Sequence, residues 1–314
     1  MKDSPVARPA ASLTEGRLRR EHPAVQQPRD MTHPPQVEVS SPPTRVGRRR
    51  LLAVAETLSD RDLAILETVS RFRVVSGDQL RRLHFHAIRT HRGGIRVCNR
   101  SLQRLVTAGA LHRLERRVGG VRAGSAGAVY AITPVGVRLR AHCRGTLETG
   151  SGRTQHEPGL AFVNHTLAAA DTYVRIVEAD RAGMFELLRF DTEPDCWRAH
   201  PTGLGATAIV KPDAYVAVAA GEFEHCAFLE VDLATEGRAA IARKLRAYNA
   251  LHASGREQAA QGVFPRVLWL TPSEQRAEAI AAVIKSLPPN VRRLFLTATA
   301  DKVLDALTDE GDAS

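Results

Sequence analysis

Residues 59–83 have the sequence SDRDLAILETVSRFRVVSGDQLRRL, in which two helix-start signals are separated by a pair of valines. Ser59 is typical of a helix cap, and the acids that follow it favour the positive end of the helix dipole. Apolar residues then recur at three- and four-residue steps, which predicts one buried helix face. They are Leu63, Ile65, Leu66, Val69 and Phe72. Ser76 predicts the cap of a second helix, and Val74-Val75 predicts a short extended link.

The segments that follow predict a third helix and a hairpin. After a loop rich in His, Arg and Gly, residues 97–109 have a helical pattern that ends at Gly109. Residues 111–116 alternate apolar and polar side chains, and residues 128–132 return after a glycine-rich turn, which predicts a β-hairpin. Thr133-Pro134 predicts the start of a last helix that reaches His142. Three helices followed by a two-stranded wing are the order of elements in a winged helix-turn-helix.

Two groups of polar side chains remain on the surface of this predicted domain. The third helix displays Arg96, Arg100, Gln103 and Arg104, and the hairpin tip carries Arg116, Arg117 and Arg122. Because a helix fits the major groove, the helix residues are candidates for contacts with base edges, while the wing arginines neutralise phosphates. Phosphate contacts would supply most of the affinity for double-stranded DNA. The alternatives are a merely solvated third helix or a domain that pairs with another protein.

Charge is distributed unevenly along the chain. The 314 residues have a formal net charge of +10, but residues 1–150 contain 27 Lys and Arg against 12 Asp and Glu. The remaining residues contain 17 against 22, so the second half is acidic. A basic half of this kind is typical of nucleic-acid binding, and the acidic half has a different task.

Composition also predicts the division into domains. Residues 1–57 are expected to form a disordered basic arm, because residues 1–45 are rich in Pro, Ser, Gln and charge without an apolar period. Its basic cluster, Arg45 and residues 48–50, either follows the DNA backbone or belongs to a solubilising tail. The predicted winged helix covers residues 58–145, a linker residues 146–158, an α/β domain residues 159–308, and a disordered tail residues 309–314.

The cysteines and the hydropathy pattern indicate the compartment. Four cysteines, at positions 98, 143, 196 and 226, form no CxxC pair and are too far apart for a disulfide scaffold. No run approaches 18 apolar residues, and the first residues lack the apolar core of a signal peptide. We therefore expect a soluble cytoplasmic protein that makes no contact with a membrane.

The second half predicts a mixed sheet flanked by helices. Helical patterns occupy residues 162–179, 235–252 and 273–285, and strand patterns occupy residues 184–190, 208–218, 226–232, 266–271 and 292–297. Residues 192–205 have no regular pattern. The predicted fold class is therefore α+β or α/β, with a winged helix-turn-helix followed by a mixed-sheet domain.

Three acids lie on neighbouring predicted strands of this sheet. Asp213 follows Pro212 at the start of one strand, and Glu230 and Asp232 share a face of the next, because side chains repeat every two residues. Oxygen ligands in this arrangement suit Mg²⁺, which polarises a phosphate and lowers the pKa of an attacking water. The pattern resembles the restriction-endonuclease-like core, so Asp213, Glu230 and Asp232 are candidate metal ligands and catalytic residues; no other cofactor is expected.

The sequence departs from that core at one position. Asp232 stands where the superfamily has its lysine, which orients the water, and an aspartate cannot do so. Lys244 on the following predicted helix is the candidate replacement. The alternative is that the acids are bonded to nearby arginines, such as Arg238 and Arg243, in an inactive sheet.

Taken together, the chain resembles the replication-relaxation family of plasmid-associated proteins. The similarity rests on the order of LSDRDLAILETVSRFRVVSGDQLRRLHF, SLQRLVTAGALHRL, AVYAITPVGV, FVNHTLAAADTYV, KPDAYV, FLEVDLATE and ARKLRAY, between about residues 58 and 270. The resemblance implies a DNA-binding protein of a mobile element that acts in plasmid replication initiation or in DNA relaxation and transfer.

Three functions remain open at this point. The first is a DNA-binding module whose acidic half forms a homodimer or recruits plasmid replication or transfer proteins. The second is a metal-dependent nuclease that uses the three acids, and the third is a transcriptional regulator. The missing lysine and the acidic second half favour the binding module, because negative charge is unfavourable beside a polyanion.

Overall fold

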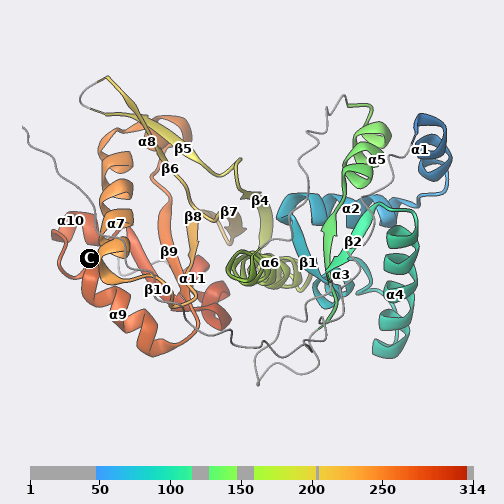
Figure 1. The fold of residues 1–314 in the computed structure, drawn as a ribbon. Coiled ribbons are helices and arrows are strands. Elements are labelled where there is room, and N and C mark those ends of the chain that lie inside the picture. The colour runs from blue at the N-terminus through green and yellow to red at the C-terminus, as the bar shows by residue number, and fades with distance from the viewer. Residues whose placement is uncertain (1–46, 115–126, 147–158, 203–204, 310–314) are drawn as a thin grey trace, which may run out of the picture. The chain divides into compact units, whose positions relative to one another are not determined.

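The N-terminal elements comprise helices and a small sheet (Figure 1). A computed structural model describes residues 47–114, 127–146, 159–202 and 205–309. Up to residue 146 its elements are α1 (Arg48–Ala55), α2 (Asp60–Phe72), β1 (Val74–Ser76), α3 (Gly77–His84), α4 (His91–Thr107), β2 (Leu111–Leu114), β3 (Val129–Ile132) and α5 (Pro134–Arg144). The strands pair in the order β1-β3-β2, with both pairings antiparallel. The predicted hairpin is therefore confirmed in its two strands.

Two capping boxes fix the starts of α2 and α3, as the serines predicted. The Ser59 hydroxyl accepts a hydrogen bond from the backbone N–H of Asp62, whose carboxylate accepts one from the backbone N–H of Ser59. Ser76 and Gln79 repeat this exchange at the start of α3. Each box satisfies backbone donors that the first turn of a helix leaves free.

Two predictions for this part were wrong in detail. Val74–Ser76 is not only an extended link but an edge strand that pairs with β3, and three residues are too few to show a strand period. Helix α4 begins at His91 rather than at 97, because Thr90 caps it by accepting a hydrogen bond from the backbone N–H of Gly93. Two consecutive glycines in its first turn, which disfavour helix by propensity, hid this start in the sequence.

Helix α1 corrects the predicted extent of the arm. Residues 48–55 are helical, and Leu51 is buried in the same core cluster as Leu139 of α5. Burial of apolar side chains on one side therefore orders a segment whose arginines had indicated a disordered arm. Residues 1–46, the greater part of that arm, lie outside the described residues, as do 147–158 and 310–314.

The C-terminal elements build a larger sheet. They are α6 (Leu160–Arg181), β4 (Glu186–Thr192), β5 (Arg198–Pro201), β6 (Thr207–Val210), β7 (Ala214–Ala220), β8 (Phe223–Val231), α7 (Arg238–Ala253), α8 (Arg256–Gln261), β9 (Arg266–Thr271), α9 (Glu274–Ile284), α10 (Pro289–Arg292), β10 (Phe295–Thr299), the 3-10 helix η1 (Ala300–Lys302) and α11 (Val303–Thr308). Strands β5 and β6 pair with each other, so the segment 192–205, predicted to be irregular, contains a strand.

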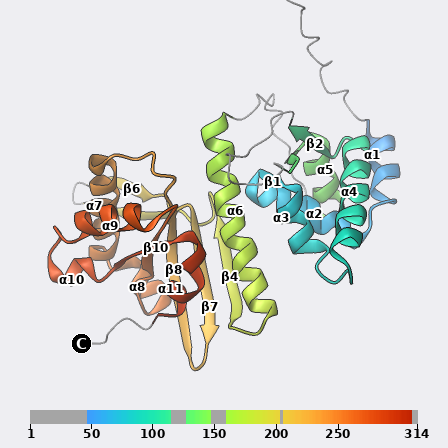
Figure 2. The same cartoon turned by 90° about the horizontal axis from the view of Figure 1, so that it is seen from below.

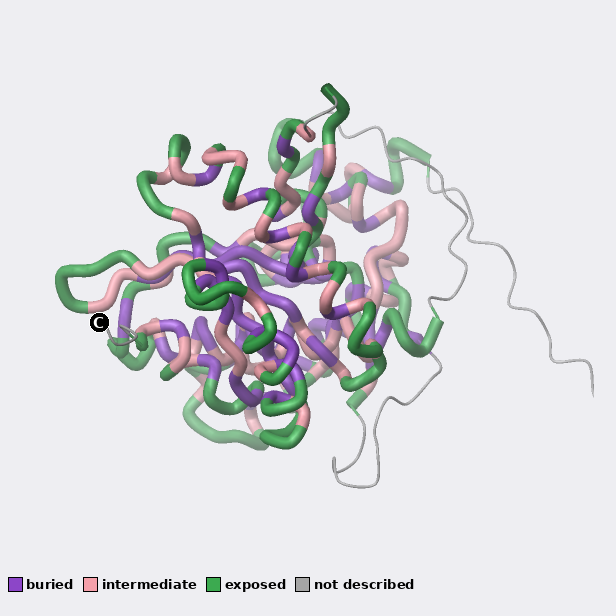
Figure 3. The backbone as a smooth tube through the Cα atoms, turned by 90° about the vertical axis from the view of Figure 1, so that its left-hand side faces the viewer, coloured by how far each residue is buried: buried purple, intermediate pink, exposed green. Residues whose placement is uncertain are grey.

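The larger sheet has the strand order β10-β9-β8-β7-β4. Strands β8, β9 and β10 run parallel, whereas β7 and β4 are antiparallel to their neighbours, which confirms the predicted mixed sheet of an α+β protein. Helices α7 and α9 cover one face, and α6 and α11 cover the other (Figure 2). The strands are mostly buried between these layers (Figure 3).

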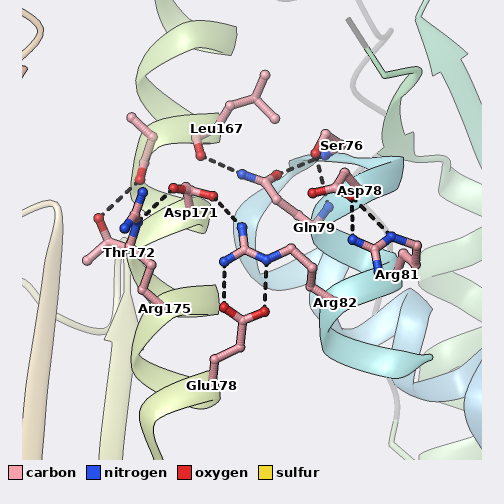
Figure 4. A network of polar contacts seen from close by, with 11 residues as sticks. Ser76, Asp78, Gln79, Arg81, Arg82, Leu167, Asp171, Thr172, Arg175 and Glu178 are labelled. Carbon is pink, nitrogen blue, oxygen red and sulfur yellow. Dashed lines mark hydrogen bonds and ion pairs between the residues drawn. The ribbon is translucent and has the colours of Figure 1, made fainter. Parts of the chain in front are cut away.

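Helix α6 also packs against α3 through charged and polar side chains (Figure 4). Arg82 of α3 donates to both carboxylate oxygens of Glu178, at 2.8 and 2.5 Å, and to Asp171 at 3.0 Å. Gln79, which already caps α3, donates its side-chain amide to the carbonyl of Leu167 at 2.8 Å. Contacts join Val46–Ser314 into one compact unit. The domain limits predicted at 145 and 159 therefore stay predictions.

Candidate functional site

The solvent face of α4 carries a row of arginines. Arg92, Arg96 and Arg100 are exposed and follow one another at four-residue steps, which places them on one side of the helix. None of them forms an ion pair with a described residue. Like charges at this spacing destabilise a helix, and Arg92 stands in the first turn, where the helix dipole is also positive. The positive charges on this face of α4 therefore repel one another, and an anionic partner would stabilise the helix.

Arg104, also predicted to lie on this face, has a second task. Its guanidinium donates to both carboxylate oxygens of Asp62, at 2.7 and 2.8 Å, and Asp62 is only 1% exposed. Burial alone would raise the pKa of Asp62, but the hydrogen bonds from Ser59 and the contact with Arg104 lower it below its usual value. Arg104 therefore joins the end of α4 to the start of α2.

Replacing Arg104 with alanine is expected to lower the free energy of unfolding by about 1 kcal/mol, since nearly half of its side chain is exposed and solvent screens the pair. Chemical denaturation at neutral pH measures the change. Arg100→Ala is the matched control, because Arg100 lies one turn away without an ion pair to a described residue. Equal stability of the two variants would contradict the structural role of Arg104.

The remaining predicted DNA-binding residues are placed only in part. Gln103 is exposed on α4 beside Arg100. The hairpin-tip residues Arg116, Arg117 and Arg122 lie outside the described residues.

Asp213 lies at the start of β7, as predicted, but it is engaged by protein groups. One of its carboxylate oxygens, Oδ2, accepts the backbone N–H of Val231 at 2.7 Å and lies 3.1 Å from Nε2 of His165 in α6. This hydrogen bond to Asp213 raises the pKa of His165 above its usual value, against the opposing effect of burial.

Glu230 is buried at the end of β8 and has both carboxylate oxygens occupied. Tyr248 donates its hydroxyl to Oε1 at 2.5 Å, and Lys244 approaches Oε2 at 2.8 Å, both from α7. Burial, followed by the negative charge of Asp213, raises the pKa of Glu230 to about 7. At Lys244 burial lowers the pKa of the ammonium, but the attraction of Glu230, Glu236 and Asp213 together raises it above its usual value. Lys244, the candidate replacement for the superfamily lysine, thus lies beside Glu230. Its catalytic role stays a prediction.

Asp232 is held by a different helix. Arg276 of α9 donates to its Oδ2 at 2.5 Å, and the backbone N–H of Ala234 donates to its Oδ1 at 2.9 Å. The nitrogen-bearing partners of the acids are therefore His165, Lys244 and Arg276, rather than the predicted Arg238 and Arg243. Lys244 follows the strand end by several residues and was accessible to sequence reasoning. Arg276 and His165 come from elements distant in sequence and carry no local signal.

The acids do not fit the predicted Mg²⁺ site. Mg²⁺ needs carboxylate oxygens that converge on one position, but both oxygens of Glu230 and both of Asp232 already accept hydrogen bonds. Among the described residues, no group of three His, Cys, Asp or Glu side chains could hold a metal ion. The arrangement instead forms a network of paired charges between the sheet edge and the helices around it.

The protein thus has an α+β fold, with a row of arginines on α4. At the edge of its mixed sheet, Asp213, Glu230 and Asp232 are bonded to side chains from the surrounding helices. A model of the replication-relaxation family matches residues 66–267, which is more than half of the chain. The protein belongs to the replication-relaxation family. Searches of curated proteins and of solved structures returned no match. In the part of the chain that the structure describes, no helix has both the length and the apolar composition needed to span a bilayer.

Proposed function

We propose that this protein binds double-stranded DNA in plasmid replication or relaxation, and that its N-terminal elements act as a winged helix with α4 in the major groove. Family membership supports the process. The arginine row of α4 carries the DNA-binding proposal. A helix fits the width of the major groove, and three arginines on one side, which make no ion pair within the described ranges, match the negative charge of the DNA.

The order of elements supports the winged-helix assignment. Helices α2, α3 and α4 are followed by the strands β2 and β3, and β1 joins β3 from between α2 and α3. In helix-turn-helix proteins the second helix of the motif enters the groove, and its N-terminal residues contact base edges. Because α4 begins at His91, the candidates for base contacts are Arg92, Arg96 and Asn99. Arg100 and Gln103 would lie nearer the sugar-phosphate backbone of the DNA.

Asparagine and arginine suit this position chemically. Arginine donates two hydrogen bonds to the edge of guanine, and asparagine pairs in the same bidentate way with adenine. Ile95, which is 39% exposed between these polar residues, offers apolar contact of the kind that a thymine methyl group accepts. The face therefore combines charge for affinity with side chains that can discriminate bases.

Replacing Arg96 and Arg100 together with alanine is expected to weaken duplex binding by roughly 30-fold and to reduce the slope of log affinity against log salt by about 2. Each lost arginine removes one charged contact with the DNA. Fluorescence anisotropy with a labelled plasmid-origin duplex at several salt concentrations measures both quantities.

The matched control replaces Arg292 and Arg293 with alanine, an exposed pair at the end of α10 that makes the same change in net charge. This control is expected to keep most of the affinity. An equal loss of duplex affinity in both double variants would mean that only the net charge of the protein matters, and the assignment of α4 would be wrong.

A metal-dependent nuclease is the weaker candidate. Its acids are those predicted from the sequence, but four of their six carboxylate oxygens are occupied in Glu230 and Asp232 alone. No observation favours it over DNA binding.

A further inference from the structure

A pocket lies where the end of α2 meets α6 and the start of β7. Its lining includes Arg71 and Arg73 from the end of α2, Phe162 and His165 from α6, Asp213 before β7, and Glu193 after β4. The α4 face contributes no residue to this lining. The pocket is therefore a separate site from the one proposed above for the duplex.

The pocket is lined by two arginines that have no carboxylate partner in the part of the chain that the structure describes. Among the described residues, neither Arg71 nor Arg73 takes part in an ion pair, and both are exposed. The guanidinium of Arg71 lies 5.4 Å from the centre of the Tyr173 ring, which holds it by a cation–π contact and leaves its outer donors free. His165 adds a third nitrogen-bearing group, 38% exposed and oriented by Asp213.

Arg73 is held in an unfavourable backbone conformation at this pocket. Its φ is 66° with ψ of −37°, a combination that L-residues other than glycine rarely adopt. Glycine would relieve the strain at no steric cost. Replacing Arg73 with glycine would therefore remove the guanidinium from the pocket without adding backbone strain.

The negative groups of the pocket narrow the choice of ligand. Oδ2 of Asp213 is already bonded to Val231 and His165, whereas Glu193 makes no ion pair with a described residue. A carboxylate beside the arginines repels a dianion more strongly than a monoanion. The two guanidinium cations beside the carboxylate of Glu193 leave a single excess positive charge, which a phosphodiester with one negative charge neutralises.

Phe162 indicates a second feature of the ligand, an unpaired base. Phe162 is 38% exposed and lines the pocket from the first turn of α6. Exposed aromatic rings next to basic side chains stack on unpaired bases in proteins that bind single strands. Paired bases in a duplex cannot reach such a ring.

We propose that this pocket binds an unpaired nucleotide of a nucleic acid, with the phosphodiester on Arg71, Arg73 and His165 and the base stacked on Phe162. The inference goes beyond the proposed duplex binding and does not depend on α4. It gives the second half of the chain direct contact with nucleic acid despite its negative net charge.

The test uses the full chain and a labelled single-stranded oligothymidylate, measured by fluorescence anisotropy. Arg73→Gly is expected to weaken binding about tenfold while leaving the melting temperature unchanged or higher, because glycine relieves the backbone. Phe162→Ala is expected to weaken it to a similar extent. Arg73→Lys, which keeps the charge and the strain, is the matched control and is expected to retain most of the affinity.

Competition and a spectroscopic readout identify the ligand. An unlabelled dinucleotide with one phosphodiester is expected to compete with the oligothymidylate and to shift the ring resonances of His165, and inorganic phosphate is expected to do neither at equal concentration. Equal competition by inorganic phosphate would replace the proposal with a free-phosphate site. Unchanged oligothymidylate binding in Arg73→Gly and Phe162→Ala would overturn it altogether.

The two sites fail independently. The Arg96 and Arg100 double variant is expected to weaken duplex binding and to keep single-strand binding, whereas Arg73→Gly is expected to weaken single-strand binding and to keep duplex binding. Loss of both activities in Arg73→Gly would show that one surface serves both, and the separate pocket would be wrong.

Discussion

Replacing Lys244 with methionine is expected to lower the free energy of unfolding by about 3 kcal/mol at pH 8, because the change leaves the buried carboxylate of Glu230 without its cationic partner. Methionine preserves the apolar stem that packs on the strand, so the loss reports on charge. Tyr248 still donates to Oε1 of Glu230, which limits the damage. Denaturant unfolding followed by circular dichroism measures the change.

The same variant provides its own control through pH. At pH 5 Glu230 binds a proton in the folded protein, because its pKa lies near 7, and the missing ammonium then matters little. The cost of Lys244→Met should therefore shrink markedly between pH 8 and pH 5. Lys302→Met, which breaks an exposed pair with Glu274, should change stability at neither pH. A pH-independent cost at Lys244 would show that packing, not charge, holds the helix to the strand.

A second large effect is expected when the pH of the wild-type protein is raised. The pKa of Glu230 is higher in the folded protein, at about 7, than its ordinary value of 4.5. The folded state therefore binds this proton more tightly than the unfolded state does. The stability that results is fully present below about pH 4.5 and is lost as the pH rises to about 7. The loss from this group is on the order of 3 kcal/mol.

Glu230→Gln isolates this contribution, because glutamine keeps the shape of the side chain and does not titrate. Subtracting the stability of the variant from that of the wild type at each pH should give a curve that falls between about pH 4.5 and pH 7. The pKa of His165 is also raised, by Asp213, so its contribution to the free energy of unfolding also falls as the pH rises. Because His165 is present in both proteins, its contribution cancels in the difference. A flat difference curve would contradict the raised pKa of Glu230.

The helices with local signals were predictable from the sequence. Ser59 and Ser76 marked their helices because a capping box is complete within four residues. The strand at 111–114 was predicted correctly, although it buries only Leu111 and Leu114 at its ends and does not alternate. Helix α4 was mistaken in its first six residues, since its start depends on Thr90 and on tertiary packing around two glycines. Helix α1 was missed because its order comes from burial of Leu51, which charge composition does not show.

The acidic site shows a different limit. Asp213, Glu230 and Asp232 were found from a short motif, and Lys244 from its position on the next helix. Their chemistry could not be deduced, because it depends on Tyr248, Arg276 and His165, which approach from three helices. Whether a carboxylate is free to bind a metal depends on these partners, and a sequence records only their residue types.

The polar contacts between α3 and α6 have a mechanical consequence for the two proposed nucleic-acid sites. Arg82 and Gln79 fasten α3 to α6 at Glu178, Asp171 and the Leu167 carbonyl, and α6 itself carries Phe162 and His165. Helix α3 lies next to α4, which we propose binds the duplex. The contacts of α3 with α6 would therefore fix the distance between the bound duplex and an unpaired nucleotide at α6. With that distance fixed, the unpaired nucleotide would lie at a constant number of base pairs from the recognition sequence.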